Sequence, residues 1–326
     1  MQKGIKIMPT IKVAKHAGFC FGVKKAIDIA EEVAQKNNGK TYVYGQLVHN
    51  EKVIKELEGK GLVFVEDLNE IPQNAVTVLR AHGEPGTTYQ ILEGKNITKS
   101  SSLNDATCPL VTLVHNVAIK LKDNGYEVIL FGKKNHPEAI GTSYHLRGKD
   151  TFVVENPEDF ESVIDYLGNY DFGKVAIISQ TTMSVYGYKQ LIENLNSKMN
   201  NEKFELMPLS LKDLSVKYGY VDTICNPTKQ RQSDTEEVAK DSDVVIVIGG
   251  KNSSNSKELY TKCKELGVEA YFIQSNEQLQ KEWLEGKEKI GVTAGASTPD
   301  YLIDEVVERI KKLTSDKKEN FVDMKI

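Results

Sequence analysis

Short apolar runs alternate with amphipathic segments along most of the chain. Five runs are rich in β-branched residues, at residues 76–79, 128–131, 175–178, 244–248 and 290–292. Five segments have helical amphipathic spacing, at residues 24–35, 110–124, 190–198, 257–266 and 299–313. This alternation predicts an α/β fold with mostly parallel sheets. Ligands of such folds bind beyond the carboxyl ends of the strands, so residues that follow the apolar runs are candidate site residues.

The polar groups after these runs repeat along the chain. The step from Cys20 to His49 is 29 residues, and the steps from Cys108 to His136 and from Cys225 to Ser253 are 28 residues each. Each cysteine opens a predicted helix, and the next strand ends supply His82, Thr181 and Ser297. The repeat predicts three similar α/β units, at residues 11–107, 108–224 and 225–313, followed by a polar tail at 314–326. Such units can close around a pseudo-threefold axis with the cysteines at the centre, although many α/β proteins place strands about 28 residues apart.

Composition narrows the class of protein. The chain has 326 residues, which favours two or three domains, and a formal net charge of -4, which argues against a general nucleic-acid binder. No apolar run approaches the roughly 18 residues that a membrane span needs. The N-terminal residues lack the apolar core of a secretory signal. We therefore expect a cytoplasmic protein that binds neither nucleic acid nor a membrane.

The cysteines are the first candidates for chemistry. Cys20, Cys108 and Cys225 are far apart in the sequence and lack the close pairs of a zinc ribbon, whereas thiolates are the usual ligands of iron–sulfur clusters. Three sulfurs on a four-iron cluster leave one iron without a protein ligand, and that iron can bind substrate and deliver electrons. Taken singly, each cysteine could also be a buried structural thiol. Cys263 has helical spacing with Leu259 and Leu266, so we interpret it as a buried thiol on a helix face.

Polar residues at several strand ends suit an anion. Segments 249–256 and 291–299 are rich in Gly, Ser, Thr and Asn and open helices, so they can bind an oxyanion or simply cap the helices. His49, His82 and His136 can donate to phosphate oxygens, and Glu138 is the carboxylate placed to act as an acid. Neither a Gly-x-Gly-x-x-Gly motif nor a complete Gly-x-x-x-x-Gly-Lys-Ser/Thr motif is present, so a nucleotide is not the expected anion. The other histidines, His16, His115 and His145, are interpreted as structural.

Together these residues resemble the 4-hydroxy-3-methylbut-2-enyl diphosphate reductase family of the non-mevalonate isoprenoid pathway. The resemblance covers about residues 11 to 312. Its motifs are Gly18-Phe19-Cys20-Phe21-Gly22-Val23, Val48-His49-Asn50, Ala81-His82-Gly83, Asp105-Ala106-Thr107-Cys108-Pro109-Leu110-Val111, His136-Pro137-Glu138, Gln180-Thr181-Thr182, Lys251-Asn252-Ser253-Ser254-Asn255-Ser256 and Gly291 to Ser297.

The resemblance implies a fold, a cofactor and a reaction. It implies a trefoil of three α/β domains around one central [4Fe–4S] cluster, held by the three repeat cysteines with one iron lacking a protein ligand. It implies a two-electron, two-proton reduction that removes the substrate hydroxyl as water and gives isopentenyl and dimethylallyl diphosphate. Electrons would come from a ferredoxin- or flavodoxin-like partner.

The resemblance also implies roles for individual residues. Glu138, Thr181 and His136 would deliver protons. The diphosphate would be held by residues of all three units, namely His49, His82, Thr228, Ser253, Ser254, Asn255 and Ser297, and His136 and Thr181 also count as substrate-binding residues.

Two other functions remain open at this stage. One is an iron–sulfur hydro-lyase acting on another small anionic substrate, which would need no external electrons. The other is a non-enzymatic iron–sulfur sensor, for which we expect a basic patch or a helix-turn-helix motif and find neither. Pro227 after the third cysteine departs from the family pattern. Residues 199–223 are longer than the usual link and are interpreted as a peripheral insertion.

Overall fold

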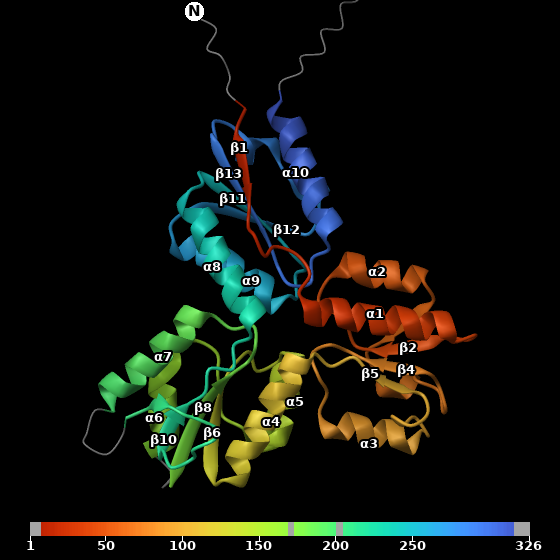
Figure 1. Cartoon of the computed structure of the whole chain (residues 1–326), viewed down its shortest axis with the longest axis vertical. Helices are drawn as coiled ribbons and strands as arrows, with labels where there is room; N and C mark the ends of the chain where they lie inside the picture. Colours follow the sequence, from red (N-terminus) through yellow and green to blue (C-terminus); the bar gives the residue numbers. More distant parts are fainter. Residues whose placement is uncertain (1–7, 169–172, 200–204, 316–326) are drawn as a thin grey trace, which may run out of the picture. The chain divides into compact units, whose positions relative to one another are not determined.

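The computed structural model describes residues 8–168, 173–199 and 205–315 and contains three parallel β-sheets flanked by helices (Figure 1). The five predicted strands are confirmed as β4 (Thr77–Leu79), β6 (Tyr126–Phe131), β8 (Lys174–Ser179), β11 (Val244–Ile248) and β13 (Lys289–Ala294). The five predicted helices are confirmed as α1 (Phe21–Lys36), α4 (Pro109–Asp123), α7 (Val185–Lys198), α9 (Ser254–Glu265) and α10 (Asp300–Thr314). The predicted α/β class with parallel sheets is therefore correct.

The first sheet has the strand order β3-β2-β4-β5. Besides β4, it contains β2 (Thr41–Tyr44), β3 (Leu62–Val65) and β5 (Leu103–Asp105). Its core includes Ile71, Leu79 and Leu92, each fully buried. The helices of this region besides α1 are α2 (Glu51–Gly59), α3 (Gly86–Gly94) and the short 3₁₀ helix η1 (Leu68–Glu70).

The second sheet has the order β7-β6-β8-β10-β9 and is covered on both faces. In β6, Ile129 and Phe131 belong to one core cluster, whereas Val128 and Leu130 belong to another. This alternation follows from the two-residue period of a strand. The remaining elements of this region are β7 (Val153–Val154), β9 (Met207–Pro208), β10 (Tyr218–Tyr220), α5 (Pro137–His145), α6 (Phe160–Gly168), η2 (Gly148–Asp150) and η3 (Pro157–Asp159).

The third sheet has the order β1-β13-β11-β12. All five residues of β11 are buried, as expected for an apolar strand inside a parallel sheet. The edge strand β1 (Thr10–Val13) comes from the N-terminal part of the chain and pairs with β13. The other elements are β12 (Glu269–Ile273), α8 (Asn226–Lys240), η4 (Asn276–Gln278) and η5 (Lys281–Leu284).

All three sheets share one order of four strands. In each sheet, the first strand that follows the cysteine-led helix in the sequence lies between the second and the third strands that follow it. The three arrangements are β3-β2-β4, β7-β6-β8 and β12-β11-β13. The fourth strand is β5, β10 or β1, and each of these precedes a cysteine in the chain. This common order supports the repeat that the sequence indicates.

Two expectations about boundaries need correction. The repeat assigns residues 11–13 to the first unit, but β1 lies in the third sheet. The segment 199–223 is not simply a peripheral insertion, because β10 pairs with β8 and corresponds to β5 and β1 of the other sheets. Residues 200–204 and 316–326, within that segment and the polar tail, lie outside the described residues. The division into three units otherwise stays a prediction.

The chain forms two compact units. One comprises Cys20–Gln230, with the first and second sheets, and the other comprises Met1–Phe19 with Arg231–Ile326 and the third sheet. Among the helices of the described part, none combines the length and apolarity that crossing a membrane requires.

Candidate active site

Each of the three repeat cysteines stands at the start of a helix. Cys20 caps α1, where its Sγ accepts the Val23 N–H at 3.4 Å. Cys108 caps α4, and Cys225 directly precedes α8. All three belong to the unit Cys20–Gln230. Helix N-termini carry partial positive charge, which favours the thiolate form that binds metals.

The surroundings of these cysteines fit a bulky metal–sulfur group. A Cβ at Gly22 would overlap Cys108 Sγ and lie 3.9 Å from Cys20 Sγ, so two of the sulfurs converge on a position without a side chain. Burial raises the pKa of the Cys225 thiol to about 11, with the Thr228 hydroxyl and N–H opposing this rise. Burial likewise raises the pKa of Cys108. Such thiols stay protonated until a metal displaces the proton.

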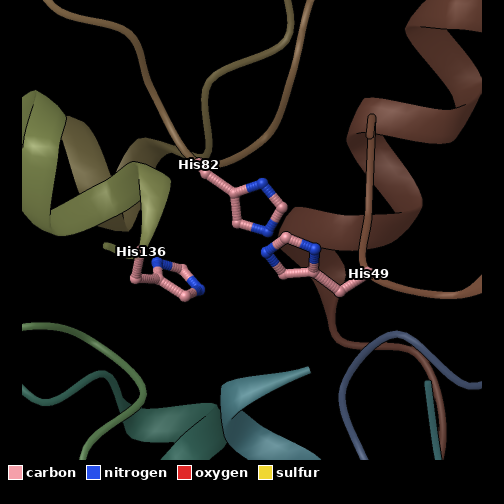
Figure 2. Close-up of side chains that lie close together, drawn as sticks. All are labelled: His49, His82 and His136. Atoms are coloured by element: carbon pink, nitrogen blue, oxygen red, sulfur yellow. The ribbon is translucent and has the colours of Figure 1, made fainter. Parts of the chain in front are cut away.

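Three histidines from three loops meet in the same unit (Figure 2). His49 follows β2, His82 follows β4, and His136 follows β6 at the start of α5. The His49 and His82 rings stack with their centroids 4.1 Å apart, and the His136 ring lies edge-on at 5.2 and 5.4 Å from them. The structure thus brings together three of the predicted phosphate ligands.

The hydrogen bond of the His136 ring favours an anion over a metal ion at its Nε2 atom. One ligand atom from each ring lies within 4.8 Å of the others, close enough for a single metal. However, His136 Nδ1 accepts the Glu138 N–H at 3.1 Å, so the neutral ring carries its proton on Nε2. An Nε2–H group donates to an oxyanion and cannot coordinate a metal ion. Burial, followed by the neighbouring positive charges, keeps the pKa of His82 well below its usual value of 6.5.

Glu138 lies beside this cluster and is almost fully buried, with 1% exposure. Its two carboxyl oxygens accept the Thr181 N–H at 2.6 Å and the Thr181 hydroxyl at 2.8 Å. Burial raises the pKa of Glu138 to about 7, and the two hydrogen bonds from Thr181 oppose that rise. A carboxyl group with such a pKa can act as a general acid near neutral pH.

The predicted anion-binding segments of the third sheet lie side by side in the other unit. Ser253 caps α9, where its Oγ accepts the Ser256 N–H at 3.2 Å. Asn255 Oδ1 accepts the Ala296 N–H at 3.0 Å, which joins the loop after β11 to the loop after β13. Ser254 Oγ is buried and makes no hydrogen bond within the described structure. The helix-capping interpretation is therefore confirmed for Ser253, and it does not explain Ser254.

Other sequence expectations can be placed as well. Thr228 is buried, and its hydroxyl lies 3.2 Å from Cys225 Sγ. Cys263 and Leu259 are fully buried together, as expected, whereas Leu266 at the end of α9 is exposed. Of the histidines interpreted as structural, the rings of His115 and His145 pack against each other at 4.7 Å.

Two residues near the cysteines received no role from the sequence. Gly22 has no side chain, which allows the Cys108 sulfur to approach its backbone, and this contact between distant segments has no local sequence pattern. Asp105 Oδ1 accepts the N–H of Thr107 at 3.1 Å and its hydroxyl at 2.6 Å, which shapes the loop into Cys108. The spacing Asp-x-Thr is typical of such a turn and could have indicated this contact.

The parallel α/β frame and the thiol and imidazole groups that it holds are typical of a metal-dependent α/β enzyme. A family model described as LytB protein matches residues 11–311. The chain therefore belongs to the LytB protein family. Members of this family depend on iron–sulfur chemistry.

Similar proteins agree with this assignment. The 4-hydroxy-3-methylbut-2-enyl diphosphate reductase of Aquifex aeolicus is 38% identical over 309 residues, covering 94% of this chain and 97% of the relative. The reductase of the same name from a Nitratiruptor species is 38% identical over 304 residues, covering 93% of this chain and 98% of the relative.

Solved structures are similar along nearly the whole chain. The structure of the E-1-hydroxy-2-methyl-but-2-enyl-4-diphosphate reductase from Plasmodium falciparum matches with a TM-score of 0.79 and 29% identity, covering 93% of this chain and 88% of that one. A structure of (E)-4-hydroxy-3-methyl-but-2-enyl diphosphate reductase matches with a TM-score of 0.60 and 36% identity, covering 94% and 100%.

Proposed function

We propose that this protein reduces 4-hydroxy-3-methylbut-2-enyl diphosphate to isopentenyl and dimethylallyl diphosphate. The names of its relatives support the reaction. The observation that carries the proposal is the buried Glu138–Thr181 pair beside three histidines, in the same unit as the three cysteines. The reductive removal of a hydroxyl group from a diphosphate substrate needs three kinds of group. These are a proton source, hydrogen-bond donors for the phosphates and thiol ligands for a metal cluster.

Cys20, Cys108 and Cys225 would hold one [4Fe–4S] cluster with one iron lacking a protein ligand. When bound, such a cluster supplies two electrons in sequence and a Lewis-acid centre. The approach of the Cys20 and Cys108 sulfurs to the same glycine and the position of each cysteine at a helix start support this assignment. The electrons would come from a ferredoxin- or flavodoxin-like protein.

The diphosphate would be bound by the histidine cluster together with polar side chains. His136 offers its Nε2–H because its Nδ1 already accepts a backbone N–H. His49 and His82 lie against it and would complete the binding surface for the diphosphate. The resemblance adds residues of the hydroxyl and amide type, namely Thr228, Thr181, Ser253, Ser254, Asn255 and Ser297.

Glu138 would protonate the oxygen that leaves. The reaction consumes two electrons and two protons, one proton for the departing oxygen and one for the carbon skeleton. Glu138 is about half protonated near pH 7, and Thr181 fixes the orientation of its carboxyl group through two hydrogen bonds. His136, whose backbone follows the same strand, would complete the proton path.

Anaerobic purification tests the proposal directly. We expect about four iron and four sulfide ions per chain, the content of one [4Fe–4S] cluster. We also expect consumption of 4-hydroxy-3-methylbut-2-enyl diphosphate with a chemical reductant and a viologen mediator. Iron-containing protein that leaves this substrate unchanged, but dehydrates another small anion without added electrons, would favour a hydro-lyase instead.

A further inference from the structure

The turn that carries His82 is braced by a buried ion pair. Arg80 follows the last residue of β4, and its guanidinium pairs with Glu84, two residues beyond His82. The side chains are 16% and 1% exposed, respectively. Glu84 also accepts a hydrogen bond from the Thr88 hydroxyl at 3.2 Å. The pair therefore spans the turn from one end to the other and fixes it to the start of α3.

The same guanidinium packs against the loop that carries His49. It lies over the Tyr44 ring, 5.4 Å from the centroid, at the end of β2. Gly45 has a φ of +66°, and a Cβ there would lie 2.5 Å from Arg80 Nη1. Next to this contact, the Ala81 N–H donates to the Leu47 carbonyl at 3.1 Å. Arg80 thus touches both histidine-bearing loops.

The His82 ring has little else to fix its position. Its Nδ1 is buried and makes no hydrogen bond within the described residues. Its contacts with the other two rings are one stacked contact, with His49, and one edge-on contact, with His136, neither of which is a hydrogen bond. His49, by contrast, is held through Nδ1 at 3.1 Å from Gln46 Oε1. The spacing of the two rings therefore depends on how the backbones of the two loops are held together.

We propose that Arg80 is a positioning residue: by clamping the loop of His49 to the turn of His82, it sets the spacing at which these rings receive the diphosphate group. This inference rests on the proposed function, because it assumes that the two histidines bind diphosphate. Arg80 acts through them, and nothing in the geometry requires it to touch the substrate.

A pair of glycine variants tests the clamp from the side opposite to the ion pair. In Gly45→Ala the new methyl group displaces the Arg80 guanidinium. Gly61→Ala is the matched control, because Gly61 also has a positive φ, +95°, but has nothing within 4 Å of its Cβ position. Both variants carry backbone strain, so both lose thermal stability. Calorimetry with inorganic diphosphate and cluster-loaded protein should show binding weakened about tenfold or more in Gly45→Ala only.

A second variant removes the clamp without leaving a buried charge unpaired. Arg80→Met/Glu84→Gln replaces both partners, and we expect the same weakening of diphosphate binding, with iron content as in the wild type. Wild-type affinity in both Gly45→Ala and the double variant would overturn the clamp. Absence of diphosphate binding by the wild-type protein would instead count against the proposed function, so the two failures can be told apart.

Discussion

Glu138 illustrates how burial sets the chemistry of a single residue. Its carboxyl group lies in a site that excludes water, and its pKa of about 7 lies far above the usual 4.5. A positioned acid typically contributes about 10²–10⁴-fold to a rate. Glu138→Gln keeps the shape and removes the proton, so we expect kcat to fall at least about a hundredfold, with KM and iron content near those of the wild type.

The control for this change is another largely buried carboxylate of the same unit. Glu127 lies in β6 and accepts hydrogen bonds from Tyr166 and Arg147, so Glu127→Gln also exchanges a bonded carboxylate for an amide. We expect it to keep a wild-type kcat. Steady-state kinetics of Glu138→Gln with an unchanged kcat would remove this residue from the mechanism.

The pKa of Glu138 also predicts two pH dependences. The acid form is needed for catalysis, so kcat of the wild type should fall as the pH rises through about 7.

The folded protein binds more protons than the unfolded chain between pH 4.5 and about 7, so this carboxyl favours folding at low pH and loses that contribution as the pH rises through the folded pKa. Thermal unfolding should therefore show Glu138→Gln gaining stability relative to the wild type from about pH 5 to about pH 8. Parallel pH curves for the two proteins would contradict the raised pKa.

Asn255 allows a test of the anion site at the level of one functional group. Its Oδ1 accepts the Ala296 N–H at 3.0 Å, so this side chain joins the two loops of the proposed anion site. Asn255→Asp keeps the acceptor and replaces the donors with a negative oxygen. A hydrogen bond to a charged group is worth about 1.5–3 kcal/mol, so diphosphate binding should weaken about tenfold or more. Asn116→Asp makes the same charge change at an exposed position of α4. Equal diphosphate affinity in both variants would restrict Asn255 to a structural role.

At the scale of elements, the place of each cysteine within its helix separates ligands from packing. Cys20, Cys108 and Cys225 stand at helix starts, whereas Cys263 lies within α9 among apolar side chains. Serine at any of the first three positions should remove most of the iron, and Cys263→Ser should retain it. Equal iron loss in all four proteins would argue for a cluster with four protein ligands.

The sequence predicted long elements well and short ones poorly. The runs that became β6, β8 and β11 are apolar over four or more residues, because both faces of their sheets are covered. In contrast, β10 is Tyr-Gly-Tyr and the edge strand β1 is exposed at both ends. Such strands depend on pairing with distant segments, so their local sequence carries little signal. The same reason explains why the Arg80 and Gly22 contacts were not predicted, whereas the strand-end histidines were.

At the scale of the molecule, the repeat is one of topology. The residues found by counting from each cysteine follow two neighbouring strands of one sheet in all three cases: β2 and β4, β6 and β8, and β11 and β13. Counting succeeded because each step contains one helix and one strand of similar length. It failed for the fourth strand of each sheet, since β1 and β10 pair across long stretches of sequence. The segment that contains β10 therefore looked like an insertion.

The N-terminal strand gives a test of this topology. If β1 is the counterpart of β5 and β10, the third sheet is incomplete without it. Two backbone hydrogen bonds join this strand to β13 and the residue before it. The Thr10 N–H donates to the Glu288 carbonyl and the Ala14 N–H donates to the Val292 carbonyl, both at 2.8 Å. Each such bond contributes about 1 kcal/mol, so deleting residues 1–14 should lower the unfolding temperature by on the order of 5 °C. Deleting residues 1–7 leaves the pairing intact and should change it little. Far-UV circular dichroism during heating distinguishes the two proteins, and equal unfolding temperatures would show that the third sheet does not need its N-terminal strand.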